Sequence, residues 1–214
     1  MLLILAYISS FGVVVPLAFS LMKLKSLDSA LRPIFYLLLP SLLTEILNLV
    51  FSANQINGMF LINIYSILEF TLLSIFYKYF FARFYDFKFI NLFHIFIPFF
   101  ALLVILSSFF IHNATLIDGL SISVEAIVFI GYSLSAFYFI MRKLLFQHLL
   151  SEPFFWINTA ILIYFSGNLF FFLFSTYLQK LNLKDFGAFY GIHSCLNILY
   201  YILISVGFWK VKKA

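Results

Sequence analysis

Long apolar segments dominate this sequence and limit what the chain can fold into. Only 10% of its 214 residues are charged, whereas a soluble globular chain carries about 25% charged residues. A helix crosses the ~30 Å hydrocarbon core of a bilayer in about 20 residues and satisfies its own backbone hydrogen bonds there. We therefore expect an all-α polytopic membrane protein in which residues 1–214 form a single domain, a seven-transmembrane-helix bundle. The predicted spans are Leu2–Met22, Pro33–Ser52, Met59–Phe81, Phe89–Ile111, Leu120–Met141, Phe154–Leu178 and Phe186–Trp209.

Lysine and arginine residues are distributed unevenly between the connections of these spans. Taken alternately, the connections on one side carry eleven basic residues and those on the other side carry two, Lys180 and Lys184. The eleven are Lys23, Lys25, Arg32, Lys78, Arg83, Lys88, Arg142, Lys143, Lys210, Lys212 and Lys213. Because positively charged connections stay in the cytoplasm, we expect the N-terminus outside and the C-terminus inside. The net charge of +5 is thus a topology signal, and no nucleic-acid partner is expected.

Polar residues within the spans gather in one layer between the bilayer midplane and the outer surface. They recur at helical spacing, as in the stripe Tyr190, His193, Asn197. A charged group at this depth costs at least ~2.5 to 3.5 kcal/mol on insertion scales, so such faces turn inward and find partners. Asn, Tyr and His also join helices by ordinary hydrogen bonds, so the three glutamates carry most of the hypothesis. The candidate ligand-binding or proton-linked pocket consists of Glu45, Tyr65, Glu69, Glu125, Tyr164, Asn168, Tyr190, His193 and Asn197.

The three glutamates share this layer with no lysine or arginine. Burial and mutual repulsion both disfavour the ionised carboxylate. We therefore expect at least one of Glu45, Glu69 and Glu125 to be neutral at pH 7, with His193 available as a partner for another. Such a group of acids titrates as a set.

One internal repeat is predicted, between Ile64–Glu69 (IYSILE) and Ile192–Asn197 (IHSCLN). Both segments lie in helices that run inward, and Tyr65 with His193, and Glu69 with Asn197, are matched at similar depth. A three-plus-one-plus-three arrangement would make the two triplets of helices parallel repeats about an axis along the membrane normal.

Several chemistries lack the residues they need. The seventh span contains no lysine for a retinal Schiff base, and only His193 among the histidines lies in the polar layer, which is too few for a zinc hydrolase. No phosphate-binding glycine loop is present. We expect no catalytic residues, metal or cofactor, although Ser194 beside His193 leaves an intramembrane enzyme open.

Three short motifs carry a resemblance to a known group of proteins. They are Leu162–Asn168 (LIYFSGN), Ile192–Asn197 and Ser205–Trp209 (SVGFW). With them the chain resembles an uncharacterised family of small seven-span bacterial integral membrane proteins. The resemblance implies a multi-pass protein of the bacterial inner membrane, and some such proteins accompany two-component signalling genes, which favours a sensory role.

Two functions from different classes follow. The first is a receptor-like or sensory membrane protein, in which an unknown small ligand or a proton enters the pocket and a cytoplasmic signalling protein reads the change in helix packing. The basic connections Lys78–Lys88 and Arg142–Glu152 are its predicted docking surfaces. The alternative is a small transporter or proton-coupled carrier built on the predicted repeats, with an intramembrane enzyme third.

Overall fold

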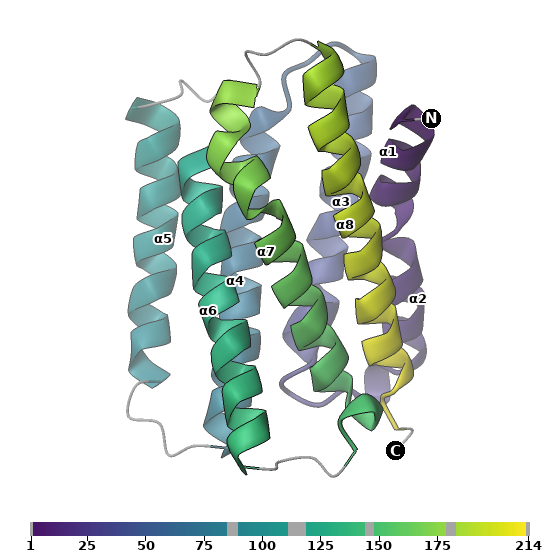
Figure 1. Cartoon of the computed structure of the whole chain (residues 1–214), viewed down its shortest axis with the longest axis vertical. Coiled ribbons are helices and arrows are strands. Elements are labelled where there is room, and N and C mark those ends of the chain that lie inside the picture. The colour runs from purple at the N-terminus through teal and green to yellow at the C-terminus, as the bar shows by residue number, and fades with distance from the viewer. Residues whose placement is uncertain (1, 85–89, 111–118, 144–147, 179–182, 213–214) are drawn as a thin grey trace. The chain divides into compact units, whose positions relative to one another are not determined.

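The computed structural model describes residues 2–84, 90–110, 119–143, 148–178 and 183–212. Every regular element in these ranges is a helix, and none is a strand, so the predicted all-α class is confirmed (Figure 1). The helices are α1 Leu2–Phe11, α2 Val14–Met22, η1 Leu24–Ser26, α3 Arg32–Ala53, α4 Met59–Phe84, α5 Ile90–Phe110, α6 Gly119–Lys143, η2 Leu149–Ser151, α7 Pro153–Leu178 and α8 Leu183–Trp209.

Five of the described helices are long and apolar enough to cross a membrane. These stretches are Arg32–Ala53, Phe60–Ala82, Gly119–Arg142, Pro153–Phe174 and Gly191–Trp209. Two shorter apolar stretches, Tyr7–Met22 and Ile95–Ser107, coincide with the first and fourth predicted spans. The predicted ends of the fourth span, Phe89 and Ile111, lie outside the described residues. The architecture is that of a multi-pass membrane protein, while the count of seven spans and the orientation stay predictions.

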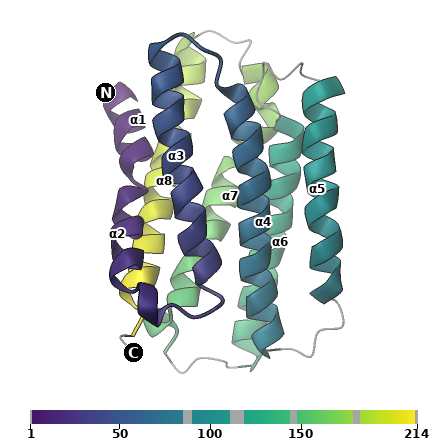
Figure 2. The ribbon, with the colours of Figure 1, turned by 180° about the vertical axis from the view of Figure 1, so that it is seen from behind.

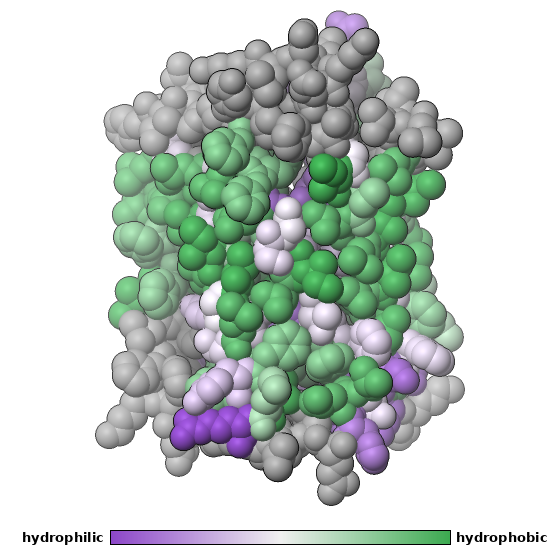
Figure 3. Space-filling model, viewed as in Figure 1, coloured by the Kyte–Doolittle hydropathy of each residue, from purple (hydrophilic) through white to green (hydrophobic). Residues whose placement is uncertain are grey.

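The described surface agrees with a lipid environment. Apolar side chains cover most of the described surface in the view of Figure 3. Large side chains such as Met22, Met141 and Phe170 are at least 70% exposed. Soluble monomers rarely expose extended apolar surface, so this surface requires a non-aqueous cover.

The first predicted span is divided into two helices. α1 ends at Phe11 and α2 begins at Val14. Pro16 explains the position of the break, because a proline has no backbone N–H to return to the carbonyl of Gly12, and its ring is tolerated in the first turn of a helix. The backbone N–H of Leu17 already donates to Val13 O at 3.2 Å, which restarts the helical pattern.

The chain groups into two compact units. The terminal unit contains Met1–Asp28, Ala126–Phe171 and Leu181–Ala214, and the central unit contains Ser29–Glu125 and Phe172–Lys180. In the central unit, α4 packs against both α3 and α5 (Figure 2). The rings of Phe70 on α4 and Phe100 on α5 stack with centroids 4.0 Å apart, which fixes the turn of α4 that also carries Glu69.

In the terminal unit, α8 packs against α1, α2 and α7. Two glycines allow α7 and α8 to approach closely. A Cβ on Gly167 would lie 2.8 Å from the methyl carbons of Leu196, and a Cβ on Gly207 would lie 2.7 Å from Cγ1 of Ile157. Small residues at such contacts let helix backbones pack tightly where lipid supplies no hydrophobic driving force.

Candidate functional site

The central unit holds a group of buried polar side chains that we call the carboxylate cluster. It consists of Ser41 on α3, Tyr65, Ser66 and Glu69 on α4, and Glu125 on α6. Tyr65 is half-buried and the other four are buried. Tyr65 and Glu69 are four residues apart, so they lie on the same face of α4, and this face carries the only acid of the helix.

Hydrogen bonds connect three members of the cluster in a chain. The hydroxyl of Tyr65 donates to Oε1 of Glu69 at 3.3 Å, and Oγ of Ser41 lies 2.8 Å from the same hydroxyl. Oγ of Ser41 also lies 2.8 Å from the backbone carbonyl of Leu37. A hydroxyl normally approaches an ionised carboxylate to about 2.5 to 2.7 Å, so Glu69 is held by a long contact.

Glu125 is the most deeply buried acid of the cluster, with 1% of its surface exposed. Its Oε2 accepts a hydrogen bond from Oγ of Ser66 at 2.7 Å, which joins α6 to α4. Its Oε1 is buried and has no hydrogen-bond partner within the described part of the chain. A buried polar atom without a partner costs about 1 to 3 kcal/mol, and more when it is charged, so this oxygen is a place where a proton or a donor group would be stabilised.

Glu69 and Glu125 are close enough to interact electrostatically. The nearest basic residue along α4 is Lys78, nine residues or about 14 Å further along the helix axis. Two negative charges in an apolar interior repel strongly because the surroundings screen them poorly. The arrangement therefore favours states in which the pair holds a proton or a bound cationic group.

The terminal unit holds a second polar group, the amide–histidine cluster, which consists of Tyr164 and Asn168 on α7 and His193 on α8. Nδ2 of Asn168 donates to the backbone carbonyl of Tyr164 at 3.0 Å, which leaves Oδ1 as the acceptor. Nδ1 of His193 lies 3.0 Å from this Oδ1 and must therefore carry the hydrogen. The His193 ring stacks on Phe171 at 5.3 Å. Both polar ends of the buried amide are thus used, as in a structural contact between helices.

Asn197 makes a separate bond in the same unit. Its Nδ2 donates to Oγ of Ser9 on α1 at 2.9 Å, and both side chains are buried. This bond ties the first helix of the chain to the last. No three His, Cys, Asp or Glu side chains meet to form a metal site in the ranges that the structure describes.

The nine predicted pocket residues fall into both units. The structure brings Tyr65, Glu69 and Glu125 together in the central unit, and Tyr164, Asn168 and His193 together in the terminal unit. The other three predicted pocket residues lie elsewhere. Glu45 is half-buried on α3, and Asn197 bonds Ser9. The side chain of Tyr190 lies outside the described residues.

Parts of the other predicted features also lie outside the described residues. The docking connections Lys78–Lys88 and Arg142–Glu152 include positions 85–89 and 144–147, which the structure does not describe. The same holds for Lys88, Lys180 and Lys213 of the topology prediction.

The two segments of the predicted repeat bury the same positions. The first residues, Ile64 and Ile192, are 53% and 58% exposed, and the last residues, Glu69 and Asn197, are 8% and 9% exposed. The second residue of each segment bonds the preceding long helix of its own unit, since Tyr65 contacts Ser41 on α3 and His193 contacts Asn168 on α7. Each segment therefore presents the same face to its own unit and uses it similarly.

Three polar partners were missed by sequence reasoning. Ser9 and Ser41 complete the bonds of Asn197 and Tyr65, and Asn158, which is fully buried, donates to the carbonyl of Ser133 at 3.2 Å and joins α7 to α6. A signal existed for Ser41, which lies four residues before Glu45 and so extends its polar face on α3. Ser9 and Asn158 have no polar residue three or four positions away in the sequence, so helical periodicity gives no signal for them.

Comparison of the chain with protein-family models, with curated proteins and with solved structures finds no match.

Proposed function

We propose that this chain is a seven-span sensory protein of the bacterial inner membrane, with its N-terminus outside and its C-terminus inside. A proton or a small ligand with a hydrogen-bond donor binds at the carboxylate cluster, and a cytoplasmic signalling protein reads the resulting change in helix packing. The observation that carries the proposal is the buried Oε1 of Glu125, which has no hydrogen-bond partner among the described residues and lies in the neighbourhood of Glu69. Ionisable groups at membrane depth are expensive and usually mark function.

The topology of the proposal is supported within the terminal unit. Nζ of Lys23, just after α2, donates to the backbone carbonyl of Val211, just after α8, at 2.6 Å. The ends of these helices therefore lie together, and both carry lysines of the side predicted to face the cytoplasm. Two predicted cytoplasmic segments far apart in sequence thus meet at one end of this unit.

Protons in the hydrogen-bond chain of the carboxylate cluster provide the switch. The chain consists of three contacts: Leu37 O with Ser41, Ser41 with Tyr65, and Tyr65 with Glu69. The hydroxyls of Ser41 and Tyr65 supply only two hydrogens for these three contacts. With Glu69 ionised, Tyr65 donates to it, and Ser41 then donates to Tyr65. With Glu69 protonated, its own hydrogen completes the third bond, and the chain can run in the opposite direction to Leu37 O.

This reversal passes through one bond that joins two helices, because Ser41 lies on α3 and Tyr65 on α4. A hydrogen bond between membrane helices contributes about 0.6 kcal/mol on average and at most about 1.7. A change in the strength of this bond can therefore bias a two-state helix packing by roughly 0.6 to 1.7 kcal/mol, which corresponds to a shift of about 3- to 18-fold.

Infrared difference spectroscopy of the purified protein tests the protonation step. Between about pH 5 and 9, a carboxyl band of a buried acid should appear in the native protein and weaken in E69Q and E125Q. The matched control is E152Q, because Glu152 lies at η2, outside the cluster. If E152Q removes as much of the band as the cluster variants do, the buried acids are not the protonated ones and the proposal fails.

Co-purification tests the output of the sensor. Tagged protein in mild detergent should retain a cytoplasmic signalling protein, and E69Q, which fixes the protonated pattern of bonds, should change the retained amount. Repeated absence of any such partner, at both ends of the pH range, would contradict a sensory role.

A proton-coupled carrier is the second candidate, and the matched burial and bonds of Ile64–Glu69 and Ile192–Asn197 favour it. Parallel repeats of this kind are a feature of transporters. Proteoliposomes distinguish the two functions. A carrier would move protons with its substrate and lose this flux in E69Q, whereas a sensor would show no flux and would require its partner.

A further inference from the structure

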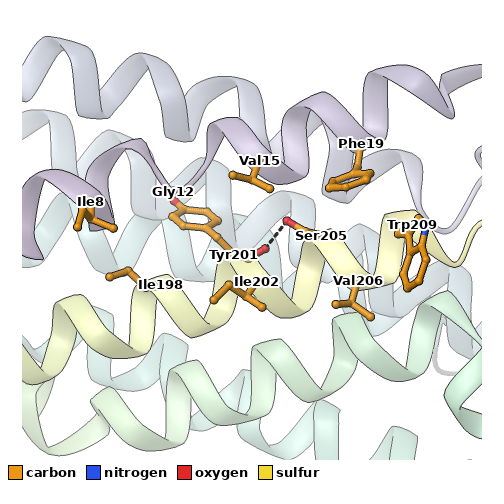
Figure 4. A pocket seen from close by; sticks show the side chains of 10 residues that line it. All are labelled: Ile8, Gly12, Val15, Phe19, Ile198, Tyr201, Ile202, Ser205, Val206 and Trp209. Atoms are coloured by element: carbon orange, nitrogen blue, oxygen red, sulfur yellow. Dashed lines mark hydrogen bonds between the residues drawn. The ribbon is translucent and has the colours of Figure 1, made fainter.

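An apolar groove runs along the surface of the terminal unit, between α1–α2 on one side and α8 on the other (Figure 4). Its volume is about 310 Å³. The wall from the N-terminal helices consists of Ile8, Gly12, Val15 and Phe19. The wall from α8 consists of Ile198, Tyr201, Ile202, Ser205, Val206 and Trp209.

Each wall of the groove is formed by residues on one face of its helix or helices. Ile8, Gly12, Val15 and Phe19 are spaced by four, three and four residues, so this face continues across the break between α1 and α2. On α8 the groove extends from Ile198 to Trp209, which is eleven steps along the helix and a length of about 16 Å at 1.5 Å per residue. This length matches one leaflet, because half of the hydrocarbon core is about 15 Å thick.

The groove offers an occupant almost nothing to hydrogen-bond. Its serine, Ser205, already donates to the backbone carbonyl of Tyr201 at 2.7 Å. Gly12 lets the two walls approach closely at the middle of the groove, since a Cβ there would lie 2.9 Å from the ring of Tyr201. Several wall side chains, including Val15 and Ile202, are more than half exposed. The occupant must therefore be apolar.

The shape of the groove suits an elongated occupant. It is lined on both sides by apolar side chains and runs along one helix for about the depth of one leaflet. A single acyl chain lying along α8 matches this length and this lining.

One end of the groove is basic. Trp209 closes the wall there, and Nζ of Lys210 lies 5.1 Å from its ring centroid. Lys23 follows α2 at the same end, where its Nζ donates to the carbonyl of Val211, and Lys212 is exposed beside it in sequence. An ammonium has three N–H donors, so Lys23 keeps capacity for an anion after its bond to Val211.

We propose that this groove is a binding site for one anionic phospholipid, with an acyl chain lying along α8 and the phosphate held by Lys23, Lys210 and Lys212. Trp209 sits between the chain and the headgroup, as aromatic residues do at membrane interfaces. The site selects its lipid from the leaflet that meets the basic end. The proposal concerns the terminal unit alone and does not depend on the function of the carboxylate cluster.

Quenching of Trp209 by brominated lipid tests this proposal. The chain has two tryptophans, so W156F leaves Trp209 as the reporter. The protein is placed in vesicles of one fixed composition of phosphatidylglycerol and phosphatidylcholine, with bromine on the acyl chains of either one or the other lipid. We expect brominated phosphatidylglycerol to quench Trp209 well beyond its share of the lipid, and brominated phosphatidylcholine to quench it less than its share.

Substitutions of the lysines and of the groove wall distinguish a specific lipid site from a general attraction of anionic lipid to a basic protein. K210Q and K212Q should each lower the preference for phosphatidylglycerol by about fivefold, since a lysine near an anionic surface contributes about that factor. The matched control is R142Q, an exposed basic residue at the end of α6, which should leave the preference unchanged. V15F should displace the chain, whereas L134F, which changes a similarly exposed residue on α6, should not.

Three results would overturn the proposal. Quenching by the two lipids in proportion to their shares would mean that no lipid is selected. An equal loss of preference in R142Q and K210Q would mean that only the overall charge matters. Weak quenching by both lipids, together with crosslinking between copies through residues of the groove, would mean that a protein helix covers it instead.

Discussion

The carboxylate cluster and the amide–histidine cluster arise from the same sequence pattern, yet they differ in how their bonds are completed. In the amide–histidine cluster both polar ends of the buried Asn168 have partners. In the carboxylate cluster, Glu125 keeps one buried oxygen without a described partner, and Glu69 is held at 3.3 Å. A polar group that completes its bonds stabilises the fold, whereas one that does not is retained at a cost, and such a cost points to function.

The largest expected effect on stability comes from a change in the amide–histidine cluster. N168L should lower the free energy of unfolding by roughly 1 to 3 kcal/mol, because it removes two hydrogen bonds of a buried amide, one of them to Nδ1 of His193. Unfolding by denaturing detergent, followed by circular dichroism, measures the change. If N168L leaves the free energy of unfolding unchanged, the amide–histidine cluster is not a structural contact and the contrast between the two clusters does not hold.

The next largest effect on stability is expected from two substitutions of Glu69, E69A and E69Q. E69A should destabilise the protein by about 1 to 2 kcal/mol, since it removes the acceptor of one hydrogen bond of the Tyr65 hydroxyl and opens a cavity on α4. E69Q keeps the shape and mimics the protonated acid, so it should cost less than about 0.5 kcal/mol. The same unfolding measurement applies. Equal losses in the two variants would mean that Glu69 is needed as an ionised group.

A smaller effect of opposite sign is expected at Glu125. E125L removes the buried Oε1, which has no described partner, and also Oε2, which accepts the hydrogen bond of Ser66. The relief of burying the acid offsets the lost bond, so the stability should stay within about 0.5 kcal/mol of the native protein or rise by about 1 kcal/mol. The infrared response to pH should weaken in this variant even though the fold is kept. A strong destabilisation would show that Glu125 is a structural residue like Asn168, which would remove the contrast between the two clusters.

The smallest effect concerns the matched serines of the repeat. S66A loses the hydrogen bond to Glu125 and should cost about 0.6 kcal/mol. S194A changes the equivalent buried position on α8 and should cost less, because the donor to a carboxylate is not involved. Thermal unfolding of both variants in one detergent gives the difference. If S194A costs more than S66A, the hydrogen bond from Ser66 to Glu125 contributes less to stability than we expect.

The all-helical class was predictable because composition alone requires it, but the packing of each helix was not. Phe70 and Phe170 are the same residue type on two membrane-type helices, yet one is 2% and the other 70% exposed. Lipid and protein interior are equally apolar, so hydrophobicity does not distinguish the face toward lipid from the face toward another helix. Polar residues do carry this information, and the acids at Glu69 and Glu125 were identified for that reason.

The partners of those acids were harder to predict than the acids themselves. Ser41 could be found from its spacing to Glu45, but Ser9 depends on a contact over 188 residues of sequence. The position of the break between α1 and α2 was signalled by Pro16, whereas the backbone bonds of the turn itself, such as that from Val15 N–H to Gly12 O, were not. Long-range contacts of small hydroxyl groups leave no periodic pattern, so only the folded chain reveals them.

The paired glycine contacts of α7 and α8 have a mechanical consequence. Gly167 meets Leu196 and Gly207 meets Ile157, so the two helices are fastened at points about 16 Å apart along α8. Two helices fastened at both points cannot tilt or slide against each other without breaking one contact. We therefore expect α7 and α8 to move together, so that a displacement near His193 would be carried along α8 toward its lysine-rich end.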